Sequence, residues 1–193
     1  MSWSTTIETG SGPMRCHPLT PDRFDDMDSV FGEQAVTRRC FCMHWRRPDG
    51  GYTDDRPNRE RFRDIAMDGP PPGLLGYLGE EAAGWVQVGP RNDFPTIRRS
   101  HLLKPVDEVE TWSVNCFVVR KSHRRSGVGR GLLAAAIEYA RSNGATILEA
   151  YPVDGERQSV VDYFTGTLGM FDKEGFVEIV RRNDTRPIVR LEM

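Results

Sequence analysis

A glycine-rich, basic loop is the part of the sequence best suited to binding an anion. Gly127 and Gly129 are separated by one residue, and Gly131 follows at the same interval. Glycine has no side chain, so a ligand can approach the backbone closely at such positions. The basic residues around these glycines are Arg120, Lys121, His123, Arg124, Arg125 and Arg130. Because guanidinium groups match the oxygen pairs of phosphates, the loop predicts a phosphate-bearing ligand.

Regular elements on both sides would hold this loop in place. Residues 110–119 are rich in β-branched and aromatic side chains and predict a strand. Residues 128–143 predict a helix, because apolar residues recur there at helical spacing: Leu132, Leu133, Ala136, Ile137 and Ala140. The first turn of a helix carries free N–H groups and the positive end of the dipole, so the loop would present an anion site.

The loop does not fully match either of two known nucleotide-binding patterns. A P-loop needs Gly-x-x-x-x-Gly-Lys followed by Ser or Thr, which the sequence lacks. A dinucleotide fingerprint needs Gly-x-Gly-x-x-Gly, whereas Leu132 occupies the place of the third glycine. The ribose-binding acid expected about 20 residues further on is present as Glu149. A dinucleotide-dependent oxidoreductase therefore remains an alternative.

The same stretch resembles the GNAT superfamily of acyl-CoA N-acyltransferases. The family motif Arg/Gln-x-x-Gly-x-Gly/Ala is matched by residues 124–129, after the strand ending Phe117-Val118-Val119. The likeness extends to the strand at 147–150 and to residues 170–176, and the order of elements matches over 73–192. It implies a mixed α/β (α+β) fold, with a largely antiparallel central sheet flanked by helices and splayed between its fourth and fifth strands.

The resemblance implies acetyl-CoA as co-substrate and no metal. Its pyrophosphate would bind the backbone amides of residues 125–130, and its pantetheine arm would pair with residues 117–119 like an added strand. The residues expected to bind it are Phe117, Val118, Val119, Arg124, Arg125, Ser126, Gly127, Val128, Gly129 and Arg130. Amine acylation also needs a base, and Glu149 lies where some members of the family carry one. The tyrosine that commonly serves as acid is replaced by Phe171, so we expect Tyr163, or else Tyr151, to substitute for it.

Composition limits the partners of the chain. The net charge of −2 gives no general attraction for nucleic acid or a membrane, and no stretch approaches a membrane span. Four cysteines without the density of a disulfide framework favour the cytoplasm. We expect an N-acetyltransferase that acts on a primary amine, preferably of a small molecule, by direct attack in a ternary complex. A CoA-binding sensor or inactive relative is the main alternative, and a homodimer is compatible with either.

Cys40 and Cys42, which are separated by one residue, could suggest a metal-binding site. Cys40, Cys42 and His44 have poor zinc spacing, because Cys-x₂₋₄-Cys and a fourth ligand are the usual requirement. Packing by Phe41, Met43 and Trp45 is the preferred interpretation. The resemblance implies that this region, between the first two long helices, shapes the acceptor site.

The chain is expected to hold one domain, residues 13–193, after a flexible tail at 1–12 that is rich in Ser, Thr and Gly. Before the glycine loop, a strand at 14–19, helices at 20–31 and 56–67, and a hairpin at 74–88 are predicted, followed by a polar loop at 91–104. After it, a strand at 146–151, a helix at 158–167 and a closing strand pair at 176–181 and 188–191 are predicted.

Overall fold

The computed structural model of the chain describes residues 3–49, 51–155 and 164–193. Its centre is an eight-stranded sheet with the order β1-β2-β3-β4-β5-β6-β8-β7. The strands are β1 (Thr5–Thr9), β2 (Gly12–Pro18), β3 (Gly73–Leu78), β4 (Glu81–Pro90), β5 (Trp112–Val119), β6 (Ile147–Ala150), β7 (Val177–Arg181) and β8 (Pro187–Glu192). Among the pairs formed by these eight strands, only β5–β6 is parallel. The expected mixed and largely antiparallel sheet is therefore confirmed.

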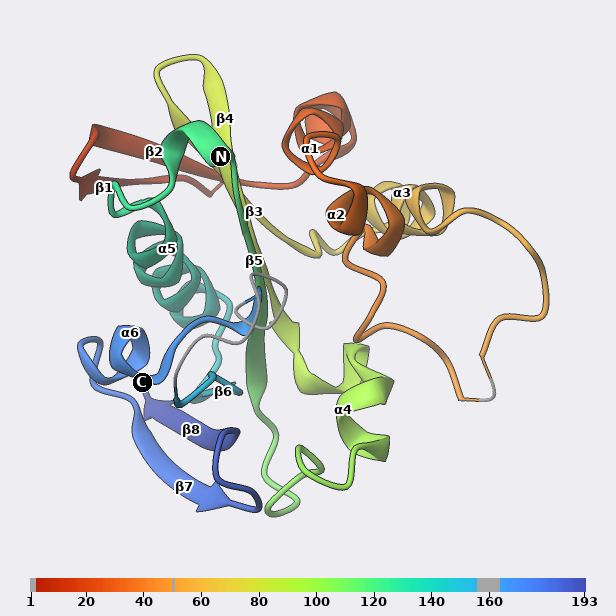
Figure 1. The fold of residues 1–193 in the computed structure, drawn as a ribbon, viewed down its shortest axis with the longest axis vertical. Coiled ribbons are helices and arrows are strands. Elements are labelled where there is room, and N and C mark those ends of the chain that lie inside the picture. Colours follow the sequence, from red (N-terminus) through yellow and green to blue (C-terminus); the bar gives the residue numbers. More distant parts are fainter. Residues whose placement is uncertain (1–2, 50, 156–163) are drawn as a thin grey trace.

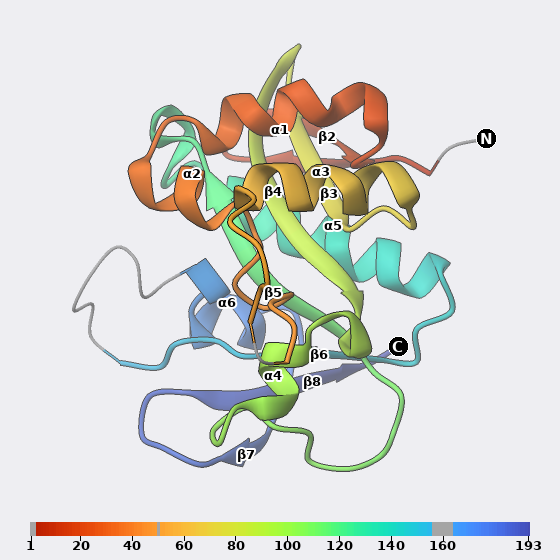
Figure 2. The ribbon, with the colours of Figure 1, turned by 90° about the vertical axis from the view of Figure 1, so that its right-hand side faces the viewer.

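Helices cover both faces of this sheet (Figure 1, Figure 2). The α-helices are α1 (Phe24–Phe31), α2 (Ala35–Cys40), α3 (Asn58–Asp68), α4 (Pro95–Arg99), α5 (Val128–Ser142) and α6 (Leu168–Asp172). Short 3₁₀ turns are η1 (Pro21–Arg23), η2 (Arg91–Asp93) and η3 (Lys121–His123). Helix α5 packs on one face, over β1 to β5, and α1 packs on the other, over β4 and β5. No helix in the described ranges is long and apolar enough to cross a membrane.

Each layer has its own apolar core. Leu132, Leu133 and Ala136 of α5 are fully buried against the sheet, as their spacing predicted. On the opposite face, Phe31 and Phe62 pack edge-on against the buried ring of Trp85. Burial of aromatic rings of this size supplies much of the stabilisation of a core. The two helical layers thereby fix the central strand β5 between them.

The sheet opens where β5 and β6 part. Strand β5 pairs with β4 along its length, but its pairing with β6 covers only Trp112, Ser113 and Val114. The register with β4 shifts at this point and leaves Asn115 without a partner across, which is a β-bulge. The expected splay is therefore present, and the two strands concerned are β5 and β6 because β1 adds a strand to the predicted order.

The N-terminal residues are a correction to the sequence prediction. Instead of a flexible tail over 1–12, the described residues form β1 and a tight turn into β2. Ile7 and Thr9 approach Gly131 of α5, and the Trp3 ring lies edge-on to Tyr139 at 5.0 Å. The alternation Thr5-Thr-Ile-Glu-Thr9 carried this signal, but the Ser, Thr and Gly content obscured it.

The other predicted elements agree with the structure to within a few residues, with four exceptions. Helices α2 and α6 were not predicted. The polar loop after β4 contains η2 and α4. The helix expected at 158–167 falls mostly on residues 156–163, which lie outside the described residues.

Candidate active site

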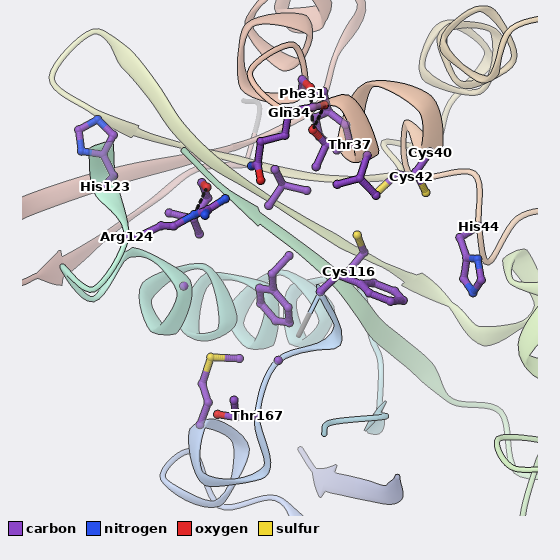
Figure 3. Close-up of a pocket in the computed structure, with 18 of the residues that line it drawn as sticks. Phe31, Gln34, Thr37, Cys40, Cys42, His44, Cys116, His123, Arg124 and Thr167 are labelled. Atoms are coloured by element: carbon purple, nitrogen blue, oxygen red, sulfur yellow. Dashed lines mark hydrogen bonds between the residues drawn. The ribbon is translucent and has the colours of Figure 1, made fainter. Parts of the chain in front are cut away.

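A cavity of about 1040 Å³ lies at the splay of the sheet (Figure 3). Its walls come from the end of α1 and from α2, from the second half of β5, from the loop before α5, and from residues 164–170. In Figure 3, Arg124 and His123 lie at one end of the cavity, and His44 and Cys116 lie toward the other. The cavity thus joins a basic end to an end lined by β5 and the residues after α2.

Six of the ten residues predicted to bind acetyl-CoA line this cavity. They are Phe117, Val118, Val119, Arg124, Arg125 and Gly129. Beyond Val114, no strand in the described part of the chain pairs with β5 on the β6 side. The cavity therefore exposes an unpaired strand edge, which is the feature a ligand amide chain needs in order to pair with a strand.

The N-terminus of α5 meets the same cavity. Gly127 is the N-cap and has no side chain to cap the helix, so within the described residues no capping side chain satisfies the first N–H groups. A Cβ atom added at Gly129 would meet no heavy atom within 4 Å. This open space, next to free N–H groups and the side chains of Arg124 and Arg125, fits a pyrophosphate.

The remaining four predicted cofactor residues do not line the cavity. Val128 is buried in the core, and Arg130 donates to Glu174 at 2.7 Å. The Ser126 hydroxyl donates to the carbonyl of His123 at 2.7 Å. Each of these three side chains has a structural partner, whereas binding of a pyrophosphate by the backbone amides of these residues stays a prediction.

Gly127 has a structural role besides the predicted one, which stays a prediction. It has a φ of +87°, where residues with a side chain are strained. A Cβ atom there would also lie 3.1 Å from the amide nitrogen of Gly10 in the β1–β2 turn. Gly127 therefore lets the hairpin pack against the start of α5, whereas Gly129 keeps the space for a ligand open.

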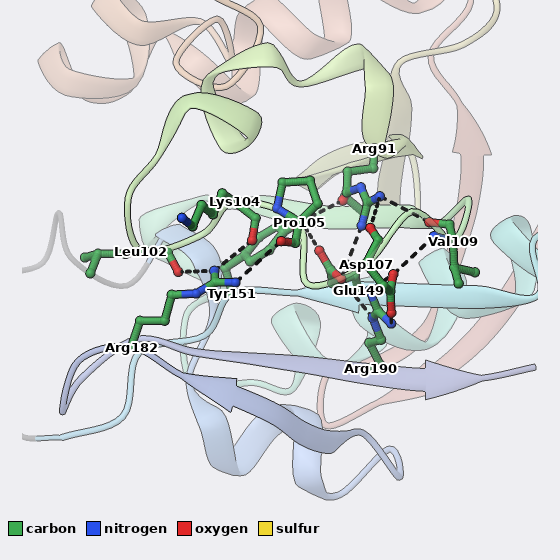
Figure 4. Close-up of polar contacts among 11 residues, drawn as sticks. Arg91, Leu102, Lys104, Pro105, Asp107, Val109, Glu149, Tyr151, Arg182 and Arg190 are labelled. Carbon is green, nitrogen blue, oxygen red and sulfur yellow. Dashed lines mark hydrogen bonds and ion pairs between the residues drawn. The ribbon is translucent and has the colours of Figure 1, made fainter.

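Glu149, the predicted base, lies in a buried polar network (Figure 4). The Tyr151 hydroxyl donates to its Oε1 at 2.6 Å, and Arg190 Nε donates to its Oε2 at 2.9 Å. Arg91 Nη1 lies 3.6 Å from Oε2, and Arg190 also pairs with Asp107 at 2.7 Å. Glu149 is not among the residues that line the cavity. Its carboxylate connects β6, β8 and the segment before β5, and its role as a base stays a prediction.

The predicted proton donors occupy other places. Tyr163 lies outside the described residues. Tyr151 is fully buried, and burial together with the neighbouring Glu149 raises its pKa well above the usual range. Phe171 is also fully buried, with its ring 5.0 Å from that of Phe176 and 6.2 Å from that of Phe117. Neither Tyr151 nor Phe171 lines the cavity.

Sequence reasoning gave no chemical role to His44, which lines the cavity beside Cys40 and Cys42. Its ring lies 4.5 Å from the Trp45 ring and 5.7 Å from the Phe164 ring. Partial burial, and then the charge of Arg186, lower the pKa of His44 below its usual value. Its imidazole is therefore mainly neutral at pH 7 and can accept a proton.

The cysteines of this region have packing roles. Cys42 is buried, and its Sγ accepts a hydrogen bond from Trp85 Nε1 at 3.0 Å. Phe41, Met43 and Trp45 are buried as expected. Within residues 3–49, 51–155 and 164–193, no group of three His, Cys, Asp or Glu side chains could hold a metal ion.

Solved structures of low sequence identity share this fold. The GNAT domain of S. lividans PAT is 17% identical with a TM-score of 0.59, covering 99% of this chain and 97% of that one. A GNAT family acetyltransferase from Listeria monocytogenes 4b F2365 is 10% identical with a TM-score of 0.60, covering 98% and 100%. The NatC complex, solved with a Gag peptide and CoA, is 10% identical with a TM-score of 0.54, covering 93% and 98%.

At the level of sequence, no curated protein matches the chain. The sequence model of the acetyltransferase (GNAT) family does match it, over residues 39–170. This range is more than half of the chain and includes α3, the central strand β5 and the basic loop before α5. The chain therefore belongs to the acetyltransferase (GNAT) family.

Proposed function

We propose that this chain is an acetyl-CoA-dependent N-acetyltransferase that acylates a primary amine of a small molecule by direct attack in a ternary complex. The observation that carries the proposal is a single cavity that joins the open N-terminus of α5 to an unpaired edge of β5. The first feature suits a pyrophosphate, and the second suits the amide groups of a pantetheine arm. Family membership supports the same reading.

The residues of the chain divide the work along the cavity. Arg124, Arg125 and the backbone at Gly129 would hold the phosphates. Phe117, Val118 and Val119 would hold the arm, and one backbone N–H group of this strand would polarise the acyl carbonyl. Acetyl-CoA supplies an activated thioester. A thiol has a reference pKa of about 8.5, so the departing thiolate needs little assistance from an acid near neutral pH.

A CoA-binding sensor is the second candidate, because the position of the usual family tyrosine holds the buried ring of Phe171. The four free cysteines support a cytoplasmic location for the proposed enzyme. The net charge of −2 supports a small-molecule acceptor over a protein bound to nucleic acid.

Two measurements test these candidates. Calorimetry with acetyl-CoA and with NAD should give binding for acetyl-CoA alone. Release of free thiol in the presence of a panel of primary amines should then exceed the rate without amine. Binding without release for every amine would favour the sensor, and binding of NAD instead would refute the acyl-CoA assignment.

A further inference from the structure

A second hollow of about 720 Å³ adjoins the acetyl-CoA cavity. It is lined by α2, by the segment that follows α2, and by the start of α3. Three residues, Val36, Cys40 and His44, line both spaces. The two hollows therefore meet at His44, toward the end of the cavity that lies away from Arg124 in Figure 3.

The side chains of the second hollow are suited to an anion. Arg39 and Arg47 line it, and neither side chain forms an ion pair or hydrogen bond within the described residues. The hydroxyl of Tyr52, another lining residue, is buried and has no partner there. Among the described residues, no Asp or Glu lines the hollow. An unpaired pair of guanidinium groups with an unused hydroxyl is a site for a carboxylate or a phosphate.

Asp49 and Asp54, the acidic groups nearest in sequence to Arg47 and Tyr52, are bound by other arginines. Asp49 pairs with Arg98 at 3.0 Å and also with Arg99. Asp54 accepts from Arg61, whose guanidinium lies 3.7 Å from the centre of the Tyr52 ring. The positive charge of Arg39 and Arg47 is therefore left for a ligand.

His44 is placed to serve an amine that extends from this hollow into the cavity. Its ring is oriented by contacts with Trp45 and Phe164, and the charged group facing it is Arg186, which donates to Thr165. The thiol of Cys40 also lines the junction, but burial raises its pKa, so it stays protonated. Among these groups, the imidazole is the one able to accept a proton near neutral pH.

We propose that the second hollow is the acceptor site, that it takes a primary amine bearing a carboxylate or phosphate, and that His44 receives the proton of this amine. The inference rests on the proposed function. In the reaction, the neutral amine nitrogen forms a bond to the acyl carbon, and the C–S bond of acetyl-CoA breaks. The electron pair of that bond leaves with the CoA thiolate, and the N–H proton passes to His44.

Matched acceptors test the anion requirement. β-Alanine is compared with its amide, and phosphoethanolamine with ethanolamine, with thiol release as the readout. Each anionic amine should have a kcat/KM about tenfold to 100-fold above its neutral partner, since a hydrogen bond to a charged group contributes at least one factor of ten. Better turnover of phosphoethanolamine than of β-alanine would identify the anion as a phosphate, and the reverse as a carboxylate.

Variants test the assigned residues. Arg39→Ala and Arg47→Ala should raise KM for the anionic amines about tenfold or more without affecting KM for the neutral ones. Arg38→Ala is the matched control, because Arg38 is exposed on the same helix and lines neither hollow. His44→Ala should lower kcat about 100-fold with little change in KM, and added imidazole should restore part of the rate.

The outcomes separate this inference from the proposed function. If the wild-type protein fails to bind acetyl-CoA, the proposed function itself is refuted. If acetyl-CoA binds but neutral and anionic amines react equally, or neither anionic amine binds or reacts, only the acceptor assignment is overturned. A His44→Ala variant with unchanged kcat would remove His44 as proton acceptor.

Discussion

Substitution of Gly129 is the sharpest test of where acetyl-CoA binds. Gly129 is the second residue of α5, its φ is not in the left-handed region, and a Cβ atom there meets no protein atom within 4 Å. Gly129→Val should therefore leave the fold intact, and Gly129→Ala should stabilise it by up to about 0.5–1 kcal/mol through helix propensity. Either side chain would occupy the space next to the free N–H groups of α5.

The expected loss of affinity follows from the hydrogen bonds that would be displaced. If a valine keeps a pyrophosphate from two backbone N–H groups, the cost at about 1.5 kcal/mol each is about 3 kcal/mol. This is a loss of roughly 100-fold or more in acetyl-CoA affinity, measured by calorimetry. Thermal unfolding of the same samples would show that the protein remains folded.

Matched substitutions make this result specific. Gly169→Val is the control, because Gly169 is the second residue of α6, has equally open space and does not line the cavity. It should bind acetyl-CoA like the wild type. Gly127→Ala is a contrasting variant that should lower stability by about 1–2 kcal/mol, given the left-handed φ of this residue. A folded Gly129→Val protein that binds acetyl-CoA with an affinity within threefold of wild type would refute binding of the pyrophosphate at the start of α5.

Three further predictions address the other buried groups. Glu149→Gln should cost about 3 kcal/mol of stability in urea unfolding, because it uncouples a buried carboxylate from Arg190; unchanged stability with a 100-fold lower kcat would instead assign Glu149 as the base. Phe171→Tyr should destabilise by about 1–3 kcal/mol without faster turnover, since the added hydroxyl enters an aromatic core; a stable and faster variant would contradict this. With Ellman's reagent at pH 8, Cys40 should react faster in the free protein than with saturating acetyl-CoA, because it lines the cavity. Equal labelling of Cys40 with and without acetyl-CoA would place the ligand elsewhere. Cys16 should not react before unfolding, because burial raises its pKa to about 12.

Local patterns were enough to predict the elements around the glycine loop. The period of the apolar residues in α5 and the β-branched run of β5 are properties of short segments, so single-sequence reasoning could locate both. The N-terminal hairpin was missed because its stability comes from contacts distant in sequence. Thr9 packs on Gly131, and Trp3 on Tyr139, and neither partner is visible in the composition of the first twelve residues.

The same distinction applies to the two glycines of the motif. Sequence reasoning gave Gly127 and Gly129 one shared reason, close approach of a ligand. The structure separates them, because the backbone of Gly10 approaches the first while open space surrounds the second. Such a difference depends on how the β1–β2 turn packs against α5, which is a tertiary fact. Only one of the two positions therefore gives a clean test of ligand binding.

The proton acceptor was the part of the site that the sequence could predict least, because its identity depends on tertiary contacts. The position of Glu149 in a predicted strand favoured it as the base. In the structure, carbonyls of the segment from Arg91 to Val109 hold Arg91 beside this carboxylate, and Asp107 of the same segment holds Arg190 there. Both oxygens of this carboxylate accept hydrogen bonds inside the network, from Tyr151 and Arg190, and Glu149 does not line the cavity. His44 instead lines the cavity, and burial together with the nearby Arg186 lowers its pKa, so that its imidazole is in the neutral form that can accept a proton. Of these two groups, His44 is the one that lines the cavity where an amine would react. The Glu149→Gln variant should therefore affect mainly stability, and the His44→Ala variant mainly turnover.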